Sequence, residues 1–127
     1  MITEDDLETL IPAFYARVRR DPLIGPIFEA AVENWDDHLH KLIAFWSSVM
    51  LGSGRYRGNP MMAHMQQRPN MTPAMFDRWL ALWAEETRAQ LPEPKAAALQ
   101  QKAHRIGESL KLGLWFRMPS AVPAPAA

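Results

Sequence analysis

Apolar residues recur at steps of three and four positions through most of this chain, and no other feature limits its fold as strongly. Leu7, Leu10, Phe14 and Val18 form one such stripe, which is the pattern of an amphipathic helix with a single apolar face. No segment shows the alternation of apolar and polar residues that is typical of a half-buried strand. The spacing therefore predicts an all-α protein of about five main helices joined by short connections.

Prolines, glycines and capping residues predict where the helices begin and end. Thr3 and Asp6 form a capping-box pattern, and Asp21-Pro22 ends the first helix because the residue before proline avoids helical geometry. The later elements follow in order: short turns over 27–32, a helix from the Asn34 cap to Gly52, a short helix from Pro60 to the break at Arg68-Pro69-Asn70, a helix from the Thr72 cap to Pro92 and Pro94, and a last helix carrying Leu99 to Leu114. We expect residues 1–118 to form one domain and the Pro/Ala-rich residues 119–127 to form a flexible tail.

The composition argues against several classes of function. Fourteen basic residues balance fourteen acidic ones, so the chain lacks the positive charge that a nucleic-acid-binding protein needs. The absence of cysteine excludes disulfides, thiolate-bound zinc, iron–sulfur clusters and thiol nucleophiles. The N-terminus is acidic where a signal peptide would be basic, and the apolar stretch 42–51 is shorter than the ~20 residues of a membrane-spanning helix. These features predict a soluble, cytoplasmic protein that binds neither nucleic acid nor a membrane.

Two histidines on either side of that apolar stretch are candidate metal ligands. His64 lies in a short predicted helix between a loop and a proline break, where one imidazole can be positioned independently of the long helices. Imidazole is the commonest metal ligand in proteins, and its other ring nitrogen then donates to a carbonyl or carboxylate. His38 lies near the start of the preceding helix, where His40 points nearly the opposite way, so these two do not form a cluster. The alternative is that His64 and His38 are ordinary, partly exposed histidines.

Tyr15 and Trp79 are candidate hydrogen-bond donors on the opposite side of such a metal. Both combine an apolar ring with a polar tip, and each lies on the apolar stripe of a long predicted helix or at its edge. The alternative is core packing, in which each polar tip is satisfied by a backbone carbonyl. The residue types alone leave both interpretations open.

The order and spacing of several short motifs resemble group III of the truncated haemoglobins, over nearly all of residues 3–117. The matching segments are Phe14-Tyr15-x-x-Val18-Arg19-x-Asp21, Leu23-x-Gly25-Pro26-Ile27-Phe28, Trp35-x-x-His38, Phe45-Trp46, Leu51-Gly52-x-Gly54-x-Tyr56-x-Gly58-x-Pro60, His64 and Phe76-x-x-Trp79-Leu80. The resemblance implies a globin-like fold, shortened to a two-over-two helical sandwich around haem b. The segment that follows His64 differs from the shorter linker of the family, and the Pro/Ala tail has no counterpart there.

The resemblance also implies a role for individual residues. His64 corresponds to the iron ligand, and Tyr15 and Trp79 correspond to the hydrogen-bond donors on the distal face, which His38 joins. The residues expected to contact the haem are Phe28, Phe45, Tyr56 and Trp79, with Arg55 and Arg57 beside Tyr56 as candidate partners of a haem propionate.

By the same resemblance, the haem iron binds dioxygen, carbon monoxide and nitric oxide reversibly, with cyanide and peroxide as further candidate ligands and an unidentified reductase as a partner. A hydrogen bond to a charged acceptor contributes roughly 1.5–3 kcal/mol, so two donors predict slow release of the ligand. Slow release favours ligand scavenging, redox chemistry or sensing over bulk oxygen delivery. An enzymatic reaction on nitric oxide or peroxide stays open, since His38 can accept a proton near the iron. The lack of a distal arginine or other dedicated catalytic group argues against a dedicated peroxidase. The alternative from another class is a cofactor-free helical interaction module, whose Trp and Met residues would form a partner surface.

Overall fold

The computed structural model describes residues 1–115 as six α-helices and one short 3-10 helix, with no strand in that range. The helices are α1 (Glu4–Arg20), α2 (Gly25–Ala31), α3 (Trp35–Leu51), α4 (Pro60–Gln67), α5 (Pro73–Gln90) and α6 (Glu93–Trp115), and the 3-10 helix η1 (Arg68–Asn70) directly follows α4. The predicted all-α class is confirmed. The predicted tail over residues 119–127 and the predicted domain end at residue 118 lie outside the described residues.

The helix ends follow the predicted capping residues, with two differences. Thr3 and Asp6 form the expected capping box at α1, and the Asn34 side chain accepts a hydrogen bond at the start of α3. Thr72 precedes α5 as expected, but its side chain makes no capping hydrogen bond. Pro94 does not close α5 and instead lies in the first turn of α6, where its missing N–H would have no helical partner in any case.

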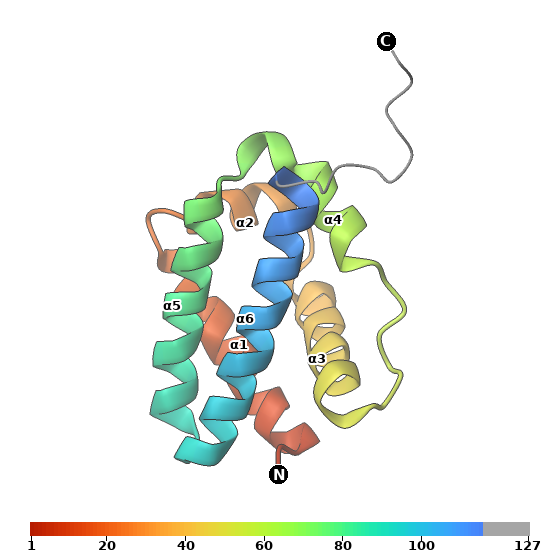
Figure 1. Cartoon of the computed structure of the whole chain (residues 1–127), viewed down its shortest axis with the longest axis vertical. Coiled ribbons are helices and arrows are strands. Elements are labelled where there is room, and N and C mark those ends of the chain that lie inside the picture. The colour runs from red at the N-terminus through yellow and green to blue at the C-terminus, as the bar shows by residue number, and fades with distance from the viewer. Residues whose placement is uncertain (116–127) are drawn as a thin grey trace.

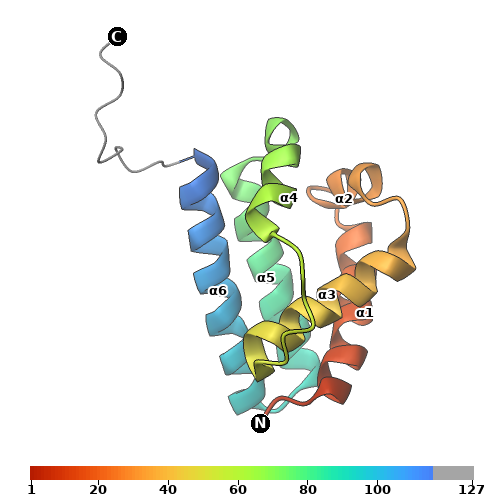
Figure 2. The same ribbon diagram turned by 90° about the vertical axis from the view of Figure 1, so that its right-hand side faces the viewer.

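The four long helices, α1, α3, α5 and α6, are arranged in two crossed layers. Helices α5 and α6 pack side by side, and α1 lies against α5 (Figure 1). Helix α3 runs obliquely across the molecule and packs on α1 (Figure 2). The short helix α4 packs instead on α6, so α3 and α4 are held by different parts of the molecule.

The apolar core consists of two clusters that meet at α6. The larger cluster includes Phe14 of α1, Trp46 of α3 and Trp83 of α5. The smaller cluster lies around Leu110 and Leu114 of α6, and the half-buried methionines of α4 pack against it. Ile106 of α6 touches both clusters. Because α4 itself contains no buried residue, its attachment depends on the smaller cluster alone.

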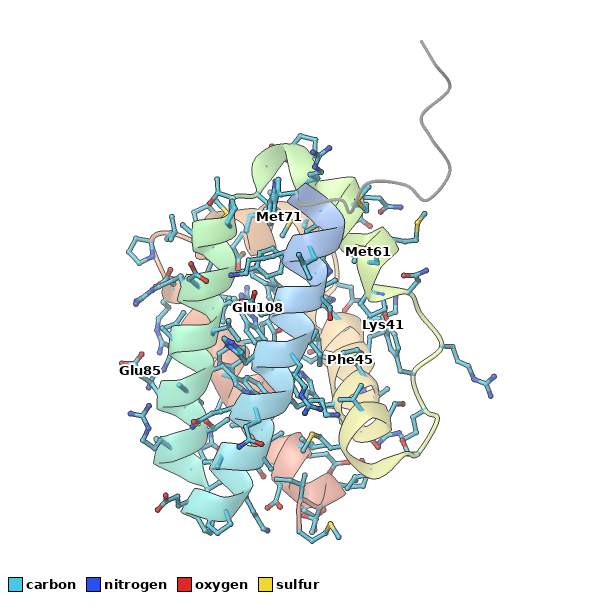
Figure 3. The ribbon with its side chains drawn as sticks, viewed as in Figure 1. Lys41, Phe45, Met61, Met71, Glu85 and Glu108 are labelled. Carbon is cyan, nitrogen blue, oxygen red and sulfur yellow. The ribbon has the colours of Figure 1, made fainter. Side chains whose placement is uncertain are left out.

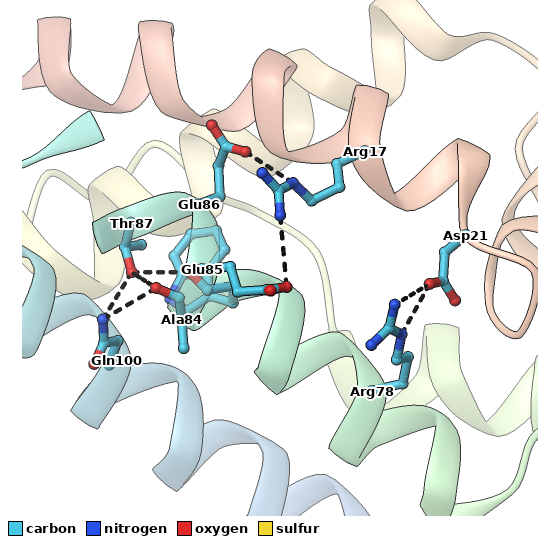
Figure 4. Close-up of polar contacts among 9 residues, drawn as sticks. Arg17, Asp21, Arg78, Ala84, Glu85, Glu86, Thr87 and Gln100 are labelled. Carbon is cyan, nitrogen blue, oxygen red and sulfur yellow. Dashed lines mark hydrogen bonds and ion pairs between the residues drawn. The ribbon is translucent and has the colours of Figure 1, made fainter. Parts of the chain in front are cut away.

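A buried carboxylate between α1 and α2 fixes the position of α2. Asp21 Oδ1 accepts a hydrogen bond of 2.8 Å from Nε of Arg78 on α5 and lies 2.8 Å from its Nη2 (Figure 4). Its other oxygen accepts hydrogen bonds from the backbone N–H groups of Leu23 and Ile24. Burial opposes ionisation of this carboxyl, but these hydrogen bonds outweigh it and lower the pKa of Asp21 below its ordinary value. The contacts join α1, α2 and α5, and thereby set where α2 places Phe28.

Candidate functional site

Tyr15 of α1 and Trp79 of α5 form a hydrogen-bonded pair inside the helical shell. The Trp79 indole N–H donates to the Tyr15 hydroxyl at 3.2 Å, and only 3% of Tyr15 is exposed. Burial raises the pKa of Tyr15 well above its ordinary value, and the Trp79 hydrogen bond only partly opposes this, so the phenol stays protonated. Since the hydroxyl accepts from Trp79 and donates to no group within residues 1–115, its own proton is available to a further acceptor.

Three more aromatic rings surround Tyr15 and complete what we call the aromatic side of the site: Tyr15, Phe28, Trp35, His38 and Trp79. The ring centroids of Phe28, Trp35 and His38 lie 5.7, 6.2 and 6.3 Å from that of Tyr15. The Arg19 guanidinium lies 4.5 Å from the centroid of the Trp35 ring and covers it. The aromatic side therefore combines residues of α1, α2, α3 and α5.

Two buried polar atoms on the aromatic side have no hydrogen-bond partner among the described residues. They are Nε1 of Trp35, which can only donate, and Nε2 of His38. Burial lowers the pKa of His38, and the charge of Lys41 adds to this effect while Asp37 opposes it, so the imidazole is neutral near pH 7. Because buried polar groups are normally satisfied, two orphaned atoms beside Tyr15 indicate a place where a small polar ligand is received.

His64 of α4 has the tautomer and the neighbours that a metal ligand requires. Its Nδ1 lies 2.6 Å from the carbonyl oxygen of Pro60, and since a carbonyl oxygen only accepts, Nδ1 carries the proton. Nε2 is then the nitrogen with a free lone pair. The ring is half-buried, and its centroid lies 5.8 Å from that of Phe76 at the start of α5. We call α4, with His64 and its neighbour Phe76, the α4 side of the site.

The remaining predicted contacts lie along α3 and the loop that follows it. The Phe45 ring packs edge-on against Tyr56 at 5.2 Å, and both are half-buried. Figure 3 labels Lys41 and Phe45 on α3 and Met61 on α4, all on the same flank of the molecule in that view. Arg55 lies on the other face of the loop, because its guanidinium pairs with Glu4 at 2.6 Å. Arg57, the second predicted propionate partner, is exposed.

The described residues fit a metal that brings most of its own ligands. Residues 1–115 contain no group of three His, Asp or Glu side chains that could hold a metal ion. One half-buried imidazole with a free Nε2 beside apolar side chains instead fits the iron of a porphyrin, whose ring nitrogens would complete the coordination. The apolar side chains that would contact such a ring belong to both core clusters: Phe28, Leu42, Phe45, Met61, Phe76 and Ile106.

The described residues form two surface hollows, of which the first borders the α4 side of the site and the second lies on α6. The first, of about 360 Å³, is lined by Met65, Arg68, Pro69 and Trp115. The second, of about 400 Å³, is lined by the exposed face of α6 at Gln100, Gln101, His104 and Arg105. Neither includes any residue predicted to bind a cofactor or ligand.

An all-helical shell that carries one imidazole with a free Nε2 and a separate pair of N–H and O–H donors is an arrangement found in globins. The family model of bacterial-like globins matches residues 3–106, and the chain belongs to this family. It is 32% identical over 109 residues to a group 3 truncated haemoglobin of Campylobacter jejuni, with 83% of this chain and 85% of that protein covered. The crystal structure of a group III truncated haemoglobin from Campylobacter jejuni matches with a TM-score of 0.85 and 29% identity, over 91% of this chain and 93% of that one. The resemblance to group III and the truncated globin fold are thus confirmed.

Membership in a globin family implies a haem cofactor and small diatomic ligands. It therefore favours the haem-binding interpretation over the cofactor-free interaction module. Among residues 1–115, no helix is both long and apolar enough to cross a membrane.

Two residues near the site were not singled out for a role from the sequence. Trp35 appeared only as part of the motif Trp35-x-x-His38, and nothing in a sequence reveals that its indole N–H is orphaned. Lys41 follows His38 by three positions, so helical spacing could have placed both on one face of α3. Its positive charge lowers the pKa of both His38 and Tyr56. Burial outweighs this effect at Tyr56 and raises the pKa of that phenol. Lys41 is thus a nearby cation on the α3 flank of the site.

Proposed function

We propose that this protein binds haem b through Nε2 of His64 and holds small diatomic molecules on the aromatic side. The observation that carries the proposal is the hydrogen bond from His64 Nδ1 to the Pro60 carbonyl at 2.6 Å. Such a bond selects the tautomer with a free Nε2, restrains the ring and makes Nε2 a better ligand. His40 and His104 are exposed, so they offer no comparable enclosed nitrogen.

The proposed haem supplies an iron that binds dioxygen, carbon monoxide or nitric oxide reversibly. On the aromatic side, the Tyr15 hydroxyl proton is free to donate, while the bond from Trp79 orients this hydroxyl. A hydrogen bond to a charged acceptor is worth roughly 1.5–3 kcal/mol, which corresponds to about one to two decades in the rate of ligand release. His38 has an unpartnered Nε2 that serves either as donor or as acceptor, according to its tautomer.

Slow release suits scavenging, redox chemistry or sensing better than bulk oxygen delivery. Cyanide and peroxide are further candidate ligands, and any redox cycle requires an external reductase. Since His38 is neutral near pH 7, it is suited to accept a proton from a protic ligand.

We assign the haem contacts to half-buried apolar rings rather than to a charged cage. Phe28 and Phe45 contribute from the aromatic side and from α3, and Tyr56 contributes from the following loop. Arg55 pairs with Glu4 at 2.6 Å and Lys41 pairs with Asp37 at 3.4 Å, so either cation would exchange a carboxylate partner to meet a haem propionate.

Absorption spectra of the purified protein in ferric, ferrous and carbonmonoxy forms test this proposal. We expect the Soret bands of a histidine-bound haem, and stoichiometric uptake of haemin by any cofactor-free fraction. A colourless protein that does not take up haemin would refute the proposal and favour the alternative function, a cofactor-free interaction module.

A further inference from the structure

Three tryptophans form a continuous stack that begins at the donor pair of the site. The ring centroids of Trp79 and Trp83 lie 5.2 Å apart with an interplanar angle of 12°, and those of Trp83 and Trp46 lie 4.5 Å apart at 20°. Trp79 is half-buried and bonded to Tyr15, whereas Trp83 is fully buried. The stack therefore leads from the site into the core, across α5 and onto α3.

Two further rings extend the stack from Trp46 towards the surface. The Phe45 ring lies 5.6 Å from that of Trp46 and 5.2 Å from that of Tyr56, edge-on in both cases. Tyr56 lies in the loop after α3 and is half-buried, so its hydroxyl is nearer to solvent than that of Tyr15. Core packing alone requires bulky apolar rings, but not three stacked, oxidisable tryptophans that a single phenylalanine ring joins to a partly exposed phenol.

We propose that Trp79, Trp83 and Trp46 form an electron relay that carries an oxidising equivalent from the donor pair of the haem site to Tyr56, with Phe45 as the bridge. Phe45 and Tyr56 are also assigned above as haem contacts, so direct oxidation of Tyr56 is the competing path, and that path would leave the tyrosyl signal unchanged in Trp83→Phe and Trp46→Phe. The relay rests on the haem binding proposed above. The rate of electron transfer between aromatic side chains falls steeply with distance, and the stacked tryptophan rings lie only 4.5 and 5.2 Å apart between centroids.

The electrons and protons of the relay balance when the oxidant is hydrogen peroxide at the haem site. Trp79 loses one electron to the oxidant and is reduced again by Trp83. Trp83 is in turn reduced by Trp46, and Trp46 is reduced by Tyr56 through Phe45. Tyr56 releases its phenolic proton to solvent and becomes a neutral tyrosyl radical. Two passages deliver two electrons, which together with two protons convert one peroxide into two waters. A soluble one-electron donor such as ascorbate, with one proton, restores the phenol.

The polar surroundings of the rings favour Tyr56 over Tyr15 as the end point. Oxidation of a phenol requires loss of its proton, and the enclosed Tyr15 hydroxyl donates no hydrogen bond to a base among residues 1–115, whereas the half-buried Tyr56 can release its proton to solvent. The Trp83 indole N–H donates to the backbone carbonyl of Leu99 at 3.1 Å, and a carbonyl is too weak a base to take the proton. An oxidised Trp83 therefore keeps its indole proton and can be reduced by the neighbouring ring.

Peroxide treatment followed by freeze-quench electron paramagnetic resonance tests the relay in the haem-loaded protein. The chain has only two tyrosines, so any tyrosyl signal belongs to Tyr15 or to Tyr56. We expect a tyrosyl radical that is lost in Tyr56→Phe and largely lost in Trp83→Phe and in Trp46→Phe. Trp115→Phe is the matched control, because Trp115 packs against Phe76 away from the stack, and it should keep the full signal.

A tyrosyl signal that persists unchanged in both Trp83→Phe and Trp46→Phe would overturn the relay, as would a signal that disappears only in Tyr15→Phe. Absence of any tyrosyl signal from a protein with normal haem spectra would also overturn it, while leaving haem binding intact. Pulse radiolysis with azide radicals, which oxidise tryptophan, tests the same path without peroxide. Tryptophanyl radicals should convert to tyrosyl in the parent protein and fail to do so in Trp83→Phe.

Discussion

The aromatic side and the α4 side of the site are held in place to very different degrees. On the aromatic side, Tyr15 belongs to a helix with six buried residues that packs on α2, α3 and α5. On the α4 side, His64 lies on an eight-residue helix with no buried residue, which packs mainly on α6. The protein core therefore fixes the hydrogen-bond donors in advance, whereas a haem bound to His64 would add contacts that α4 lacks. The following predictions either break one side or compare the two.

Replacing His64 by glycine should have the largest effect, because it removes the proposed bond between protein and iron. Haemin affinity should fall by more than the roughly 10–100-fold that loss of an outer-shell partner typically costs. Titration of haemin followed by absorption measures this, and free imidazole should restore the bands. His104→Gly is the control, since that histidine is exposed on α6. Equal haemin affinity in both variants would contradict the assignment of His64.

Tyr15→Phe should speed release of bound dioxygen by about 10–100-fold, because it removes a donor worth roughly 1.5–3 kcal/mol. Stopped-flow displacement of dioxygen by carbon monoxide measures the rate. Trp79→Phe should act in the same direction, through loss of the bond that orients Tyr15. His104→Gly changes an exposed residue of α6 that has no role in the site, and it should leave the rate close to that of the parent protein.

Asp21→Asn should lower the free energy of unfolding by about 1.5–3 kcal/mol at pH 7, because the charged hydrogen bonds from Arg78 are weakened. The folded-state pKa of Asp21 is lowered, so its contribution is fully present above the unfolded pKa and is lost as pH falls through the folded one. Urea unfolding at pH 7 and at about pH 3 should therefore show the two proteins converging in acid. A difference that persists unchanged in acid would rule out this electrostatic account.

Asn59→Ala should have the smallest effect on global stability, about 1 kcal/mol or less, since it removes only the cap of α4. Its effect should be local: faster amide hydrogen exchange in residues 60–67 and weaker haemin binding. Thr3→Ala removes the cap of α1 at similar cost, yet it should leave haemin affinity unchanged. If both variants weaken haemin binding equally, the proposed contrast between the two sides is wrong.

The sequence predicted the helices well because local physical chemistry determines them. Apolar spacing and capping residues such as Thr3 and Asn34 act within a few positions, and the structure places the helix ends close to them. Pro94 was misassigned because a proline is compatible with the end of one helix and with the first turn of the next. The group III resemblance came from spacing over the whole chain, which no single motif would have supported.

The candidate site was less accessible to sequence reasoning, because its geometry joins distant segments. The bond between Trp79 and Tyr15 spans 64 positions, and the pairing of Arg55 with Glu4 spans 51. The latter gives Arg55, a candidate propionate partner suggested by charge and position, a carboxylate partner within the protein. The tautomer of His64 and the orphaned Nε1 of Trp35 depend on three-dimensional neighbours, so no pattern of residue types reveals them.

The central claim is that Nε2 of His64, and no other histidine nitrogen, binds the haem iron. Nitrogen-15 NMR of the histidine rings in the diamagnetic carbonmonoxy protein tests it most directly, since the chain has only four histidines. We predict that Nε2 of His64 alone carries the shift of a metal-bound nitrogen, while its Nδ1 keeps a slowly exchanging proton through the Pro60 carbonyl. A metal-bound shift on His38, or a His64 ring that titrates freely, would contradict the account.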